Sequence, residues 1–393
     1  FELGAAKGAT LQITMLGYKT AEKEVTTATF YPITLEDDSK LVDEVVVVGY
    51  GAVKKSDLTG SVASVKMGAL DNLSSTSVDG LLQGRAAGLQ VLNTSQDPGA
   101  GAIVRIRGNS SLEGSNTPLV VVNGFPMGDA GNLSQINVSD IQSIEILKDA
   151  SASAIYGSRG ANGVILITTK KGSADHSTHV SYSNNTTFSN PFVTHQFQNT
   201  YGRQSGDFKS WGEKLGKPSS YDPNDFFQTG YNTQNTVSVA SSSERSQSFV
   251  SAGSVNSRGI IPNNEYSRYN FTIRHGRELV KDKLELDTDF FFTKSESQNG
   301  VAQGLYYNPL LPVYLFPPSE NFERLKTYEI YDSGRNFATM YWPYSNTGLD
   351  ALSQNPYWIT NRNMFNTTQN RYIVSGSLKW KITDWINLSG RIR

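Results

Sequence analysis

The C-terminal half of the sequence consists of long segments in which apolar and polar residues alternate. In one of them, residues 283–297, Leu284, Leu286 and Phe290 fall on one face, while mostly charged or hydroxyl side chains fall on the other. A period of two with a polar second face indicates β-strands in a sheet that is wet on one side. The segments with this pattern are 179–189, 234–242, 246–257, 268–276, 283–297, 370–383 and 385–393.

The connections between these strands alternate in length. In chain order the links are 190–233 (long), 241–245 (short), 257–267 (intermediate), 276–282 (short), 298–367 (long) and 383–385 (short). Links of the longer kind are uncommon in compact soluble domains. Long strands joined alternately by short turns and long loops are typical of an outer-membrane β-barrel. A large soluble β-sandwich is the alternative that this pattern leaves open.

The composition argues against most enzymes and metalloproteins. Cysteine is absent, which excludes disulfide frameworks, thiolate metal sites and cysteine nucleophiles. The four histidines are scattered and assemble neither a zinc site nor a Ser-His-Asp triad. A formal net charge of −1 gives no field that would attract nucleic acid. We therefore predict a protein that is not an enzyme and has no catalytic residues, metal, cofactor or nucleic-acid partner.

The first 172 residues have a different character. Residues 9–36 read as the last strands of a small β unit, and residues 58–172 mix short helical patterns with short strands such as GVILITT. The second region is large enough to form a compact α+β domain. Because Phe1 lies in what looks like the middle of a domain and Arg393 lies inside a strand pattern, we expect the chain to be part of something longer.

The run DEVVVVGYG, residues 43–51, lies between the polar patches LEDDSK (35–40) and KKSD (54–57). Four consecutive valines strongly favour extended backbone. The run is therefore either a strand buried in a neighbouring domain or an exposed strand that pairs with a partner. From the residue types alone, the buried strand is favoured.

Five segments occur in an order that resembles a known family. They are DEVVVVGYG (43–51), LQGRAAGLQV (82–91), VRIRGNSSL (104–112), PLVVVNGFPM (118–127) and IEILKDASASAIYGSRGANGVILITTKKG (144–172). Together they resemble the TonB-dependent outer-membrane transporters, and in particular the SusC-like (SusC/RagA) branch found in Bacteroidetes. The last segment is the most specific of the five.

The resemblance implies four parts. Residues 1–37 would be the end of a carboxypeptidase-regulatory-like β domain, a small β-sandwich, and residues 38–57 a linker that carries the TonB-contacting segment. Residues 58–173 would form an α+β plug domain. Residues 174–393 would supply the first seven or so strands of an antiparallel transmembrane β-barrel, which in plugged transporters of this kind has about 22 strands.

The same resemblance implies a function, which is TonB-dependent import of a bulky oligosaccharide or oligopeptide, gated by the plug. The implied partners are TonB, a SusD-like surface lipoprotein, the nutrient and outer-membrane lipid, with a dimer of SusC–SusD pairs as one assembly. The alternatives are a siderophore-type receptor and a surface adhesin that transports nothing. The SusC-like motifs weigh against the first, and the plug-like segment 144–172 weighs against the second.

The resemblance also reverses the interpretation of the valine run. It implies a TonB-contacting segment made of Asp43, Glu44, Val45, Val46, Val47, Val48, Gly49 and Tyr50. An extended, tethered segment of this kind can add a strand to the edge of a partner sheet through main-chain hydrogen bonds.

Polar residues in the expected plug are candidates for contacts with the barrel wall. They are Arg105, Arg107, Arg159 and Asp149, with Glu145 and Asp149 as partners within the plug itself. The glycines of YGSRGANG imitate a phosphate-binding loop, but no Lys-Ser/Thr pair follows, so tight turns are the better interpretation.

The link 298–367 is rich in aromatic residues and proline. Aromatic rings stack on sugars or grip peptides, and they are also enriched at protein interfaces. We favour contact with the surface lipoprotein over contact with substrate. The candidate residues are Tyr306, Tyr307, Tyr341, Trp342, Tyr357 and Trp358.

Overall fold

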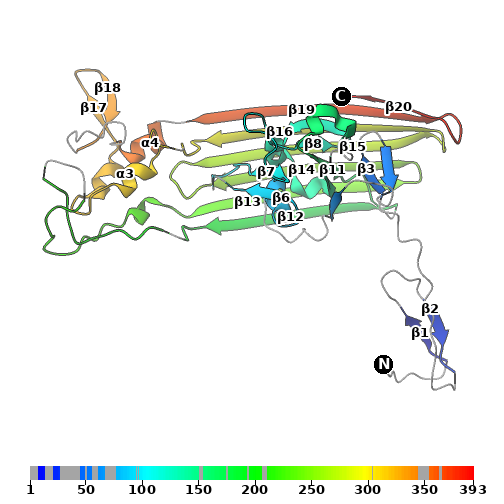
Figure 1. Ribbon diagram of the computed structural model, residues 1–393, viewed down its shortest axis with the longest axis horizontal. Coiled ribbons are helices and arrows are strands. Elements are labelled where there is room, and N and C mark those ends of the chain that lie inside the picture. Colours follow the sequence, from blue (N-terminus) through cyan, green and yellow to red (C-terminus); the bar gives the residue numbers. More distant parts are fainter. Residues whose placement is uncertain are drawn as a thin grey trace.

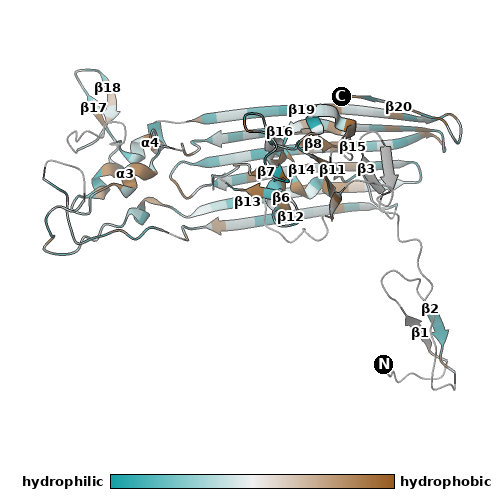
Figure 2. Cartoon of the chain, in the orientation of Figure 1, coloured by the Kyte–Doolittle hydropathy of each residue, from teal (hydrophilic) through white to brown (hydrophobic). Residues whose placement is uncertain are grey.

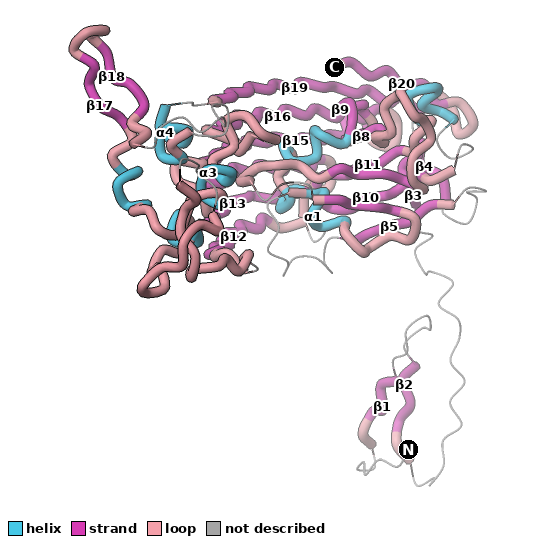
Figure 3. The backbone as a smooth tube through the Cα atoms, turned by 60° about the vertical axis from the view of Figure 1, so that its left-hand side comes forward, coloured by secondary structure: helices cyan, strands magenta, loops and turns pink. Residues whose placement is uncertain are grey.

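The computed structural model describes residues 8–13, 21–26, 45–48, 51–54, 61–66, 77–93, 95, 97–149, 154–173, 176–192, 194–205, 210–302, 304–343, 354–362 and 365–393. Two bodies of structure lie against each other in this part of the chain. One is a large sheet whose strands run along the molecule, and the other is a smaller α+β domain on one face of that sheet (Figures 1 and 3).

The large sheet has seven antiparallel strands, in the order β12-β13-β14-β15-β16-β19-β20. Their bounds are β12 Thr178–Ser189, β13 Gly230–Ser243, β14 Ser246–Arg258, β15 Glu265–Val280, β16 Leu284–Gln298, β19 Asn366–Lys381 and β20 Asn387–Ile392. The seven alternating segments of the sequence are therefore strands, as predicted. β15 has 16 residues, more than the ~9–11 that a tilted strand needs to cross a bilayer.

The large sheet has its apolar residues on the outer, exposed face and its polar residues on the inner, covered face, which is the reverse of a sheet in a soluble protein. On β15 the side chains of Phe271 and Ile273 are 37% and 38% exposed, whereas those of Asn270 and Thr272 are 8% and 4% exposed. Apolar residues thus point away from the α+β domain and polar residues point towards it, so apolar and polar bands alternate along the strands (Figure 2). This arrangement is typical of a sheet whose outer face meets lipid.

The α+β domain is built on a five-stranded sheet, in the order β5-β10-β11-β8-β9. Its elements are β5 Val62–Lys66, α1 Val78–Leu82, β6 Leu89–Leu92, β7 Ile103–Ile106, β8 Leu119–Val122, β9 Phe125–Asp129, η3 Ala130–Gln135, η4 Val138–Asp140, β10 Ile141–Leu147, η5 Ala154–Gly160 and β11 Val164–Thr169. β8 and β11 pair in parallel, and apart from Thr168 and Thr169 at the end of β11 their residues are all apolar, as expected for strands buried on both faces. The main core lies where α1 and the β6–β7 hairpin cover one face.

Two small hairpins precede this domain. β1 (Thr10–Ile13) pairs with β2 (Ala21–Glu24), and β3 (Val45–Val48) pairs with β4 (Gly51–Lys54). The prediction that the valines are extended is confirmed. Their partner is the segment that directly follows them, which neither interpretation of the sequence considered. Among the described helices, none is long and apolar enough to cross a membrane.

The two long links of the large sheet fold together at one end of it, whereas the short turns lie at the other end (Figure 1). We call this folded region the loop module. It contains η6 Pro223–Phe226, α3 Leu310–Tyr314, η7 Phe322–Lys326, β17 Glu329–Asp332, β18 Phe337–Met340 and α4 Pro356–Arg362. Its core is made of Phe226, Ile261, Val313, Phe316, Phe322 and Leu325. The long links are therefore a packed unit with its own core.

Gly163 fixes the turn into β11, and we expect its replacement by alanine to loosen the α+β domain. Its φ is +86°, and an added Cβ would lie 3.0 Å from the Leu147 carbonyl oxygen and 2.7 Å from Ile106 Cδ1. A left-handed backbone with a side chain costs about 1–2 kcal/mol, and the clash adds to this. Hydrogen exchange of the full-length protein should show faster exchange at β10 and β11 in Gly163→Ala. Replacement of Gly216, where an added Cβ meets nothing within 4 Å, should leave the exchange unchanged.

Candidate functional site

The candidate site is the interface between the α+β domain and the polar face of the large sheet. Asp140, at the end of η4, is a buried carboxyl at its centre. Its Oδ2 atom accepts hydrogen bonds from Ser251 Oγ at 2.7 Å and from Thr272 Oγ1 at 2.8 Å. Asn137 Nδ2 donates to Oδ1 at 3.2 Å. One side chain of the domain thus joins two neighbouring strands, β14 and β15.

Burial raises the pKa of Asp140 above its ordinary value. Hydrogen bonds from Ser251 and Thr272, and the positive charges of Lys170 and Arg268, oppose this shift without cancelling it. The folded protein therefore holds this proton to a higher pH than the unfolded chain does. Protonation of Asp140 therefore adds to the free energy of unfolding. This contribution is present at low pH and is lost as the pH rises through the folded-state pKa of Asp140. Acidification towards that pKa therefore favours the packed interface.

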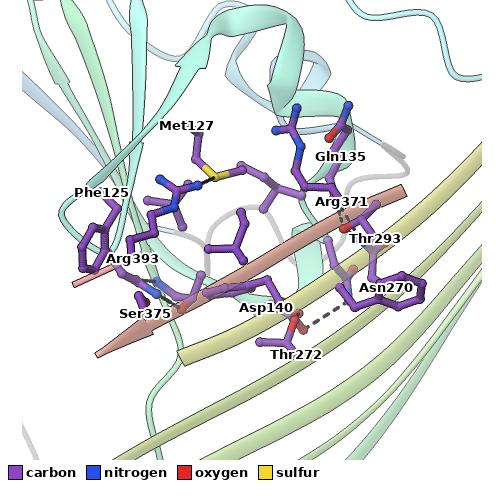
Figure 4. Close-up of a pocket in the computed structure, with 18 residues that line it drawn as sticks. Phe125, Met127, Gln135, Asp140, Asn270, Thr272, Thr293, Arg371, Ser375 and Arg393 are labelled. Atoms are coloured by element: carbon purple, nitrogen blue, oxygen red, sulfur yellow. Dashed lines mark hydrogen bonds between the residues drawn. The ribbon is translucent and has the colours of Figure 1, made fainter. Parts of the chain in front are cut away.

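Polar side chains of the sheet also bind backbone carbonyls of η3. Arg268 is 1% exposed, and its Nη1 atom donates to the Ser134 carbonyl. Asn270 Nδ2 donates to the Gln135 carbonyl and to Thr293 Oγ1, both at 2.9 Å (Figure 4). These bonds give the Ser134 and Gln135 carbonyls, at the end of a short helix, side-chain donors from the sheet.

Arg274 ties the end of β11 to the sheet. Its Nη1 atom donates to the Thr169 carbonyl at 2.6 Å and to Asn123 Oδ1 at 3.2 Å. Its Nε atom lies 3.0 Å from Asp289 Oδ1 on the neighbouring strand, which holds the guanidinium in place. Asn123 and Thr169 are themselves hydrogen-bonded, because Thr169 N donates to Asn123 Oδ1 at 3.0 Å.

A charged cluster follows where the chain leaves the domain. Lys171 Nζ lies 2.5 Å from Asp287 Oδ1 and 3.2 Å from Glu285 Oε1, and Lys379 Nζ lies 3.3 Å from Glu285 Oε2. Glu285 and Lys379 are well exposed, so solvent screens the two pairs of Glu285, and each of these contributes only about 0–1 kcal/mol. These contacts can be broken one at a time.

A cavity of about 40 Å³ remains at this interface, and Figure 4 shows its lining. Phe125 and Met127 of the domain face Arg371 and Ser375 of the sheet across it. A water molecule needs about 10–15 Å³ of such space, so the cavity holds a few waters at most. The domain therefore blocks this part of the sheet's inner face to any bulky solute.

The apex of the domain is tied to the loop module by buried amides. Asp97 accepts hydrogen bonds from Asn264 Nδ2 and from Val301 N, both at 3.2 Å. Asn264 Nδ2 also donates to the Asn299 carbonyl, and Asn299 Nδ2 donates to the Thr360 carbonyl, both at 3.0 Å. A continuous chain of hydrogen bonds thus runs from Asp97 of the domain to helix α4.

Within the loop module, Asn355 holds the start of α4. It is fully buried, and its Nδ2 atom donates to the Leu325 carbonyl at 2.9 Å and to the Tyr341 carbonyl at 3.0 Å. Its Oδ1 atom accepts from Tyr357 N at 2.9 Å, which caps the helix. The chain of amides therefore ends at helix α4, whose first turn Asn355 holds in place.

The structure places the predicted polar residues within the α+β domain. Arg107 forms an ion pair with Asp149, the internal partner that the sequence suggested. The Ser61 backbone N–H and then Arg107 hold the pKa of Asp149 below its ordinary value. Arg105 lies partly buried on β7, and Arg159 is exposed on η5. The hydrogen bonds and ion pairs described above between the domain and the large sheet come from other residues, so a role of these four in plug–barrel contact stays a prediction.

The predicted aromatic residues divide into exposed and packed ones. Tyr306 and Tyr307 are 64% and 46% exposed. Trp342 and Tyr357 pack against the core of the loop module, and burial is the main cause that raises the pKa of Tyr357 to about 12. Tyr341 Oη accepts a hydrogen bond from Arg324, and Trp358 lies half-buried on α4.

The predicted TonB-contacting segment is described only in part. Val45, Val46, Val47 and Val48 form β3, whereas Asp43, Glu44, Gly49 and Tyr50 lie outside the described residues. In the part of the chain that the structure describes, β3 pairs with β4 alone, which leaves its other edge unpaired.

Reading the sequence alone missed the residues of the sheet that bind the domain. The signal was present in RYNFTIR (268–274), where Arg268, Asn270, Thr272 and Arg274 alternate with apolar residues. What it lacked was any indication of which face is inside. Across the described ranges, no three His, Asp or Glu side chains group as metal ligands.

Comparison with known proteins gives matches to both bodies of structure. The family described as TonB-dependent Receptor Plug Domain matches residues 54–164. The TonB-dependent receptor SusC of Bacteroides thetaiotaomicron is 36% identical over 335 residues, which cover 80% of this chain and 33% of SusC. The TonB-dependent receptor P26 of Formosa agariphila is 39% identical over 322 residues, which cover 77% of this chain and 32% of P26. The chain thus spans about a third of the length of these relatives.

Among solved structures, the RagAB peptide importer in its open-open state has a similar fold. The TM-score is 0.68 at 24% sequence identity, and the match covers 88% of this chain and 42% of that chain. The closed-closed state of the same importer gives a TM-score of 0.68 at 23% identity. At this level of identity the similarity supports the fold, in which a plug domain is followed by an antiparallel sheet.

Proposed function

Because the chain belongs to the SusC-like TonB-dependent receptors of the outer membrane, we propose that the full-length protein imports a bulky nutrient across that membrane. The α+β domain is the plug, and the large sheet is part of the wall around it. Energy is supplied through TonB, the plug moves, and the nutrient passes to the periplasm. Substrate binding and gating need no catalytic residue, and the homologous proteins are transporters.

The observation that carries this proposal is the polar attachment of the plug to a sheet with an apolar outer face. Asp140, Arg274 and Lys171 hold the plug through hydrogen bonds and ion pairs. A hydrogen bond contributes only about 0.5–1.5 kcal/mol net between neutral groups and about 1.5–3 kcal/mol when one group is charged, because water replaces it when it breaks. An interface of this kind can open and reform, because water can bind its polar groups when it opens. The side chains of an apolar interface of equal area would gain no such hydrogen bonds.

The chain of buried amides supports coupling between the loop module and the plug. A ligand or partner that displaces α4 acts on Thr360, and through Asn299 and Asn264 on Asp97 of the plug. Such coupling requires that the two arrangements of the loops bind the plug differently. The state described here, in which these amide nitrogens donate to Asp97, Asn299 and Thr360, is one of these arrangements.

Three partners complete the proposal. TonB pairs with the segment around β3, a SusD-like surface lipoprotein contacts exposed loop residues such as Tyr306 and Tyr307, and the substrate is an oligosaccharide or oligopeptide. The description of RagAB as a peptide importer bears on the oligopeptide, whereas the name of SusC states no substrate.

Uptake that depends on TonB tests the proposal. Cells that carry the full-length gene should accumulate a labelled oligosaccharide or oligopeptide, and loss of TonB should reduce the accumulation to background while surface binding remains. Accumulation of a ferric chelate alone would indicate a siderophore receptor. Surface binding without accumulation in either strain would indicate an adhesin, and both results contradict the proposal.

A further inference from the structure

β15 and the residue before it contact the plug at each inward-facing position from 264 to 276. The ring of Tyr266 covers Gly99, where an added Cβ would lie 2.3 Å from Tyr266 Cδ2, and an added Cβ on Gly276 would lie 2.5 Å from Lys171 Cε. Hydrogen bonds connect the other positions to the plug. In order from the loop module, the residues are Asn264, Tyr266, Arg268, Asn270, Thr272, Arg274 and Gly276, and their partners are Asp97, Gly99, Ser134, Gln135, Asp140, Thr169 and Lys171. One strand of the wall therefore forms a continuous line of attachment for the plug.

The contacts along this line are shielded from water. The exposed fractions of Asn264, Tyr266, Arg268, Asn270 and Thr272 are 2%, 9%, 1%, 8% and 4%. A buried donor or acceptor that loses its partner is costly as long as no water can take the partner's place. A small displacement of the plug from β15 would therefore leave several polar groups unpaired before water reaches them.

On the side of β16, β19 and β20, space partly separates the plug from the wall. The cavity of about 40 Å³ lies here, and Figure 4 shows Phe125 and Met127 across it from Arg371 and Ser375. A second cavity, of about 160 Å³, lies between β8 and β11 of the plug and β16, β19 and β20 of the wall. It has room for several water molecules. Both cavities extend from β15 to β19, so the plug is less closely packed on this side than along β15.

Bonds that cross this second side are within reach of solvent. Lys171 of the plug pairs with Glu285 of β16, and their side chains are 26% and 41% exposed. Gln135 Nε2 donates to Gln369 Oε1 of β19, and Gln369 is exposed. Water can replace the partner of an exposed group as soon as the contact breaks. Separation of the plug from β16 and β19 is therefore easier than separation from β15.

We propose that the plug stays fastened to β15 when it opens, and that it first parts from β16, β19 and β20. The inference rests on the proposed import function, since it states where the passage through the wall begins. A rotation of the plug about the line of β15 joins the two cavities into one opening. The same rotation keeps the buried hydrogen bonds along β15, so the plug returns to its place afterwards.

Cross-linking in the full-length protein tests this proposal. The 393 residues contain no cysteine, so introduced pairs are the only thiols in this part of the chain. Asn123→Cys with Arg274→Cys joins the plug to β15, where Arg274 Nη1 lies 3.2 Å from Asn123 Oδ1. The matched pair, Met127→Cys with Arg393→Cys, joins the same β8–β9 hairpin to the residue that follows β20, where Arg393 Nη2 lies 3.1 Å from Met127 Sδ. A short bismaleimide closes each pair.

Opening is measured as the conductance of the purified protein in planar lipid bilayers, with urea added below the concentration that unfolds the barrel. This readout needs neither TonB nor a known substrate. Before the reagent is added, both pairs should conduct in urea. After cross-linking, the β15 pair should keep its conductance, whereas the Met127–Arg393 pair should fall to the level measured without urea.

A further pair, Gln135→Cys with Asn270→Cys, fastens the plug to β15 at another point and should conduct after cross-linking as the first β15 pair does. Loss of conductance on cross-linking to β15, or conductance that persists when Met127→Cys is joined to Arg393→Cys, would overturn the proposal. TonB-dependent uptake by the unmodified protein is measured separately. Absence of uptake together with the expected conductances would contradict import and leave the role of β15 intact.

Discussion

Deletion of residues 43–48 from the full-length protein is expected to abolish uptake while surface expression and substrate binding remain. The deletion removes β3, whose outer edge is unpaired in the described part of the chain. An unpaired edge offers backbone N–H and C=O groups to a partner strand, and we propose that TonB supplies that strand. The substrate-facing regions lie elsewhere in the fold, so their affinity should not change. Uptake of labelled substrate and its surface binding are measured on the same cells.

Substitutions separate backbone pairing from loss of apolar side chains. Val46 and Val47 are consecutive, so their N–H groups point to opposite edges of the strand. The double change Val46→Pro, Val47→Pro removes a donor from each edge and should reduce uptake to background. The double change Val46→Thr, Val47→Thr keeps the donors and the β-branched shape and should retain uptake. Normal uptake in the proline variant or in the deletion would refute the assignment of this segment to TonB.

Asp140→Ala is expected to make the outer membrane permeable, because it weakens the attachment of the plug to the large sheet. The change leaves Ser251 Oγ and Thr272 Oγ1 without their acceptor. Each buried donor left unsatisfied costs about 1–3 kcal/mol. The population of loosened plugs should therefore rise tenfold or more. Sensitivity to vancomycin, which normal outer membranes exclude, and hydrogen exchange at β10 and β11 are the two measurements.

Asp140→Asn and Asp384→Ala serve as comparisons for this experiment. The asparagine keeps one acceptor oxygen, so its effect should be intermediate. Asp384 lies in the exposed turn between β19 and β20 and pairs with Lys381 at 2.7 Å, and its loss should change neither readout. If cells with Asp140→Ala are no more sensitive to vancomycin than cells with Asp384→Ala, and if hydrogen exchange at β10 and β11 is equally slow in both variants, the carboxyl does not hold the plug.

Local features of the fold could be predicted from local sequence. The alternation of apolar and polar residues predicted the strands of the large sheet, because side chains of a strand point to opposite faces in turn. Asn-Gly is a strong signal for a two-residue hairpin turn, and Asn123–Gly124 join β8 to β9 with positive φ at both residues, at 50° and 84°. Both signals depend on neighbours in the chain alone.

Contacts between distant residues could not be predicted in the same way. Asp140 lies 111 residues from Ser251 and 132 residues from Thr272, and no pattern of the sequence links them. Asn264 and Asp97 are separated by 167 residues. Asparagine, serine and threonine on strands look alike whether they face solvent or a buried interface, so their role depends on what packs against them.

The amino-acid sequence alone determined which segments are strands, that the valine run is extended, and that five motifs resemble the SusC-like receptors. Only the tertiary structure decided that the polar face of the large sheet is the inner one, that Asp140 joins two strands, and that the long links pack into a module with its own core. The physical reason is that backbone preference and periodicity act over a few residues. Burial and pairing are instead set by groups that come together only when the chain has folded.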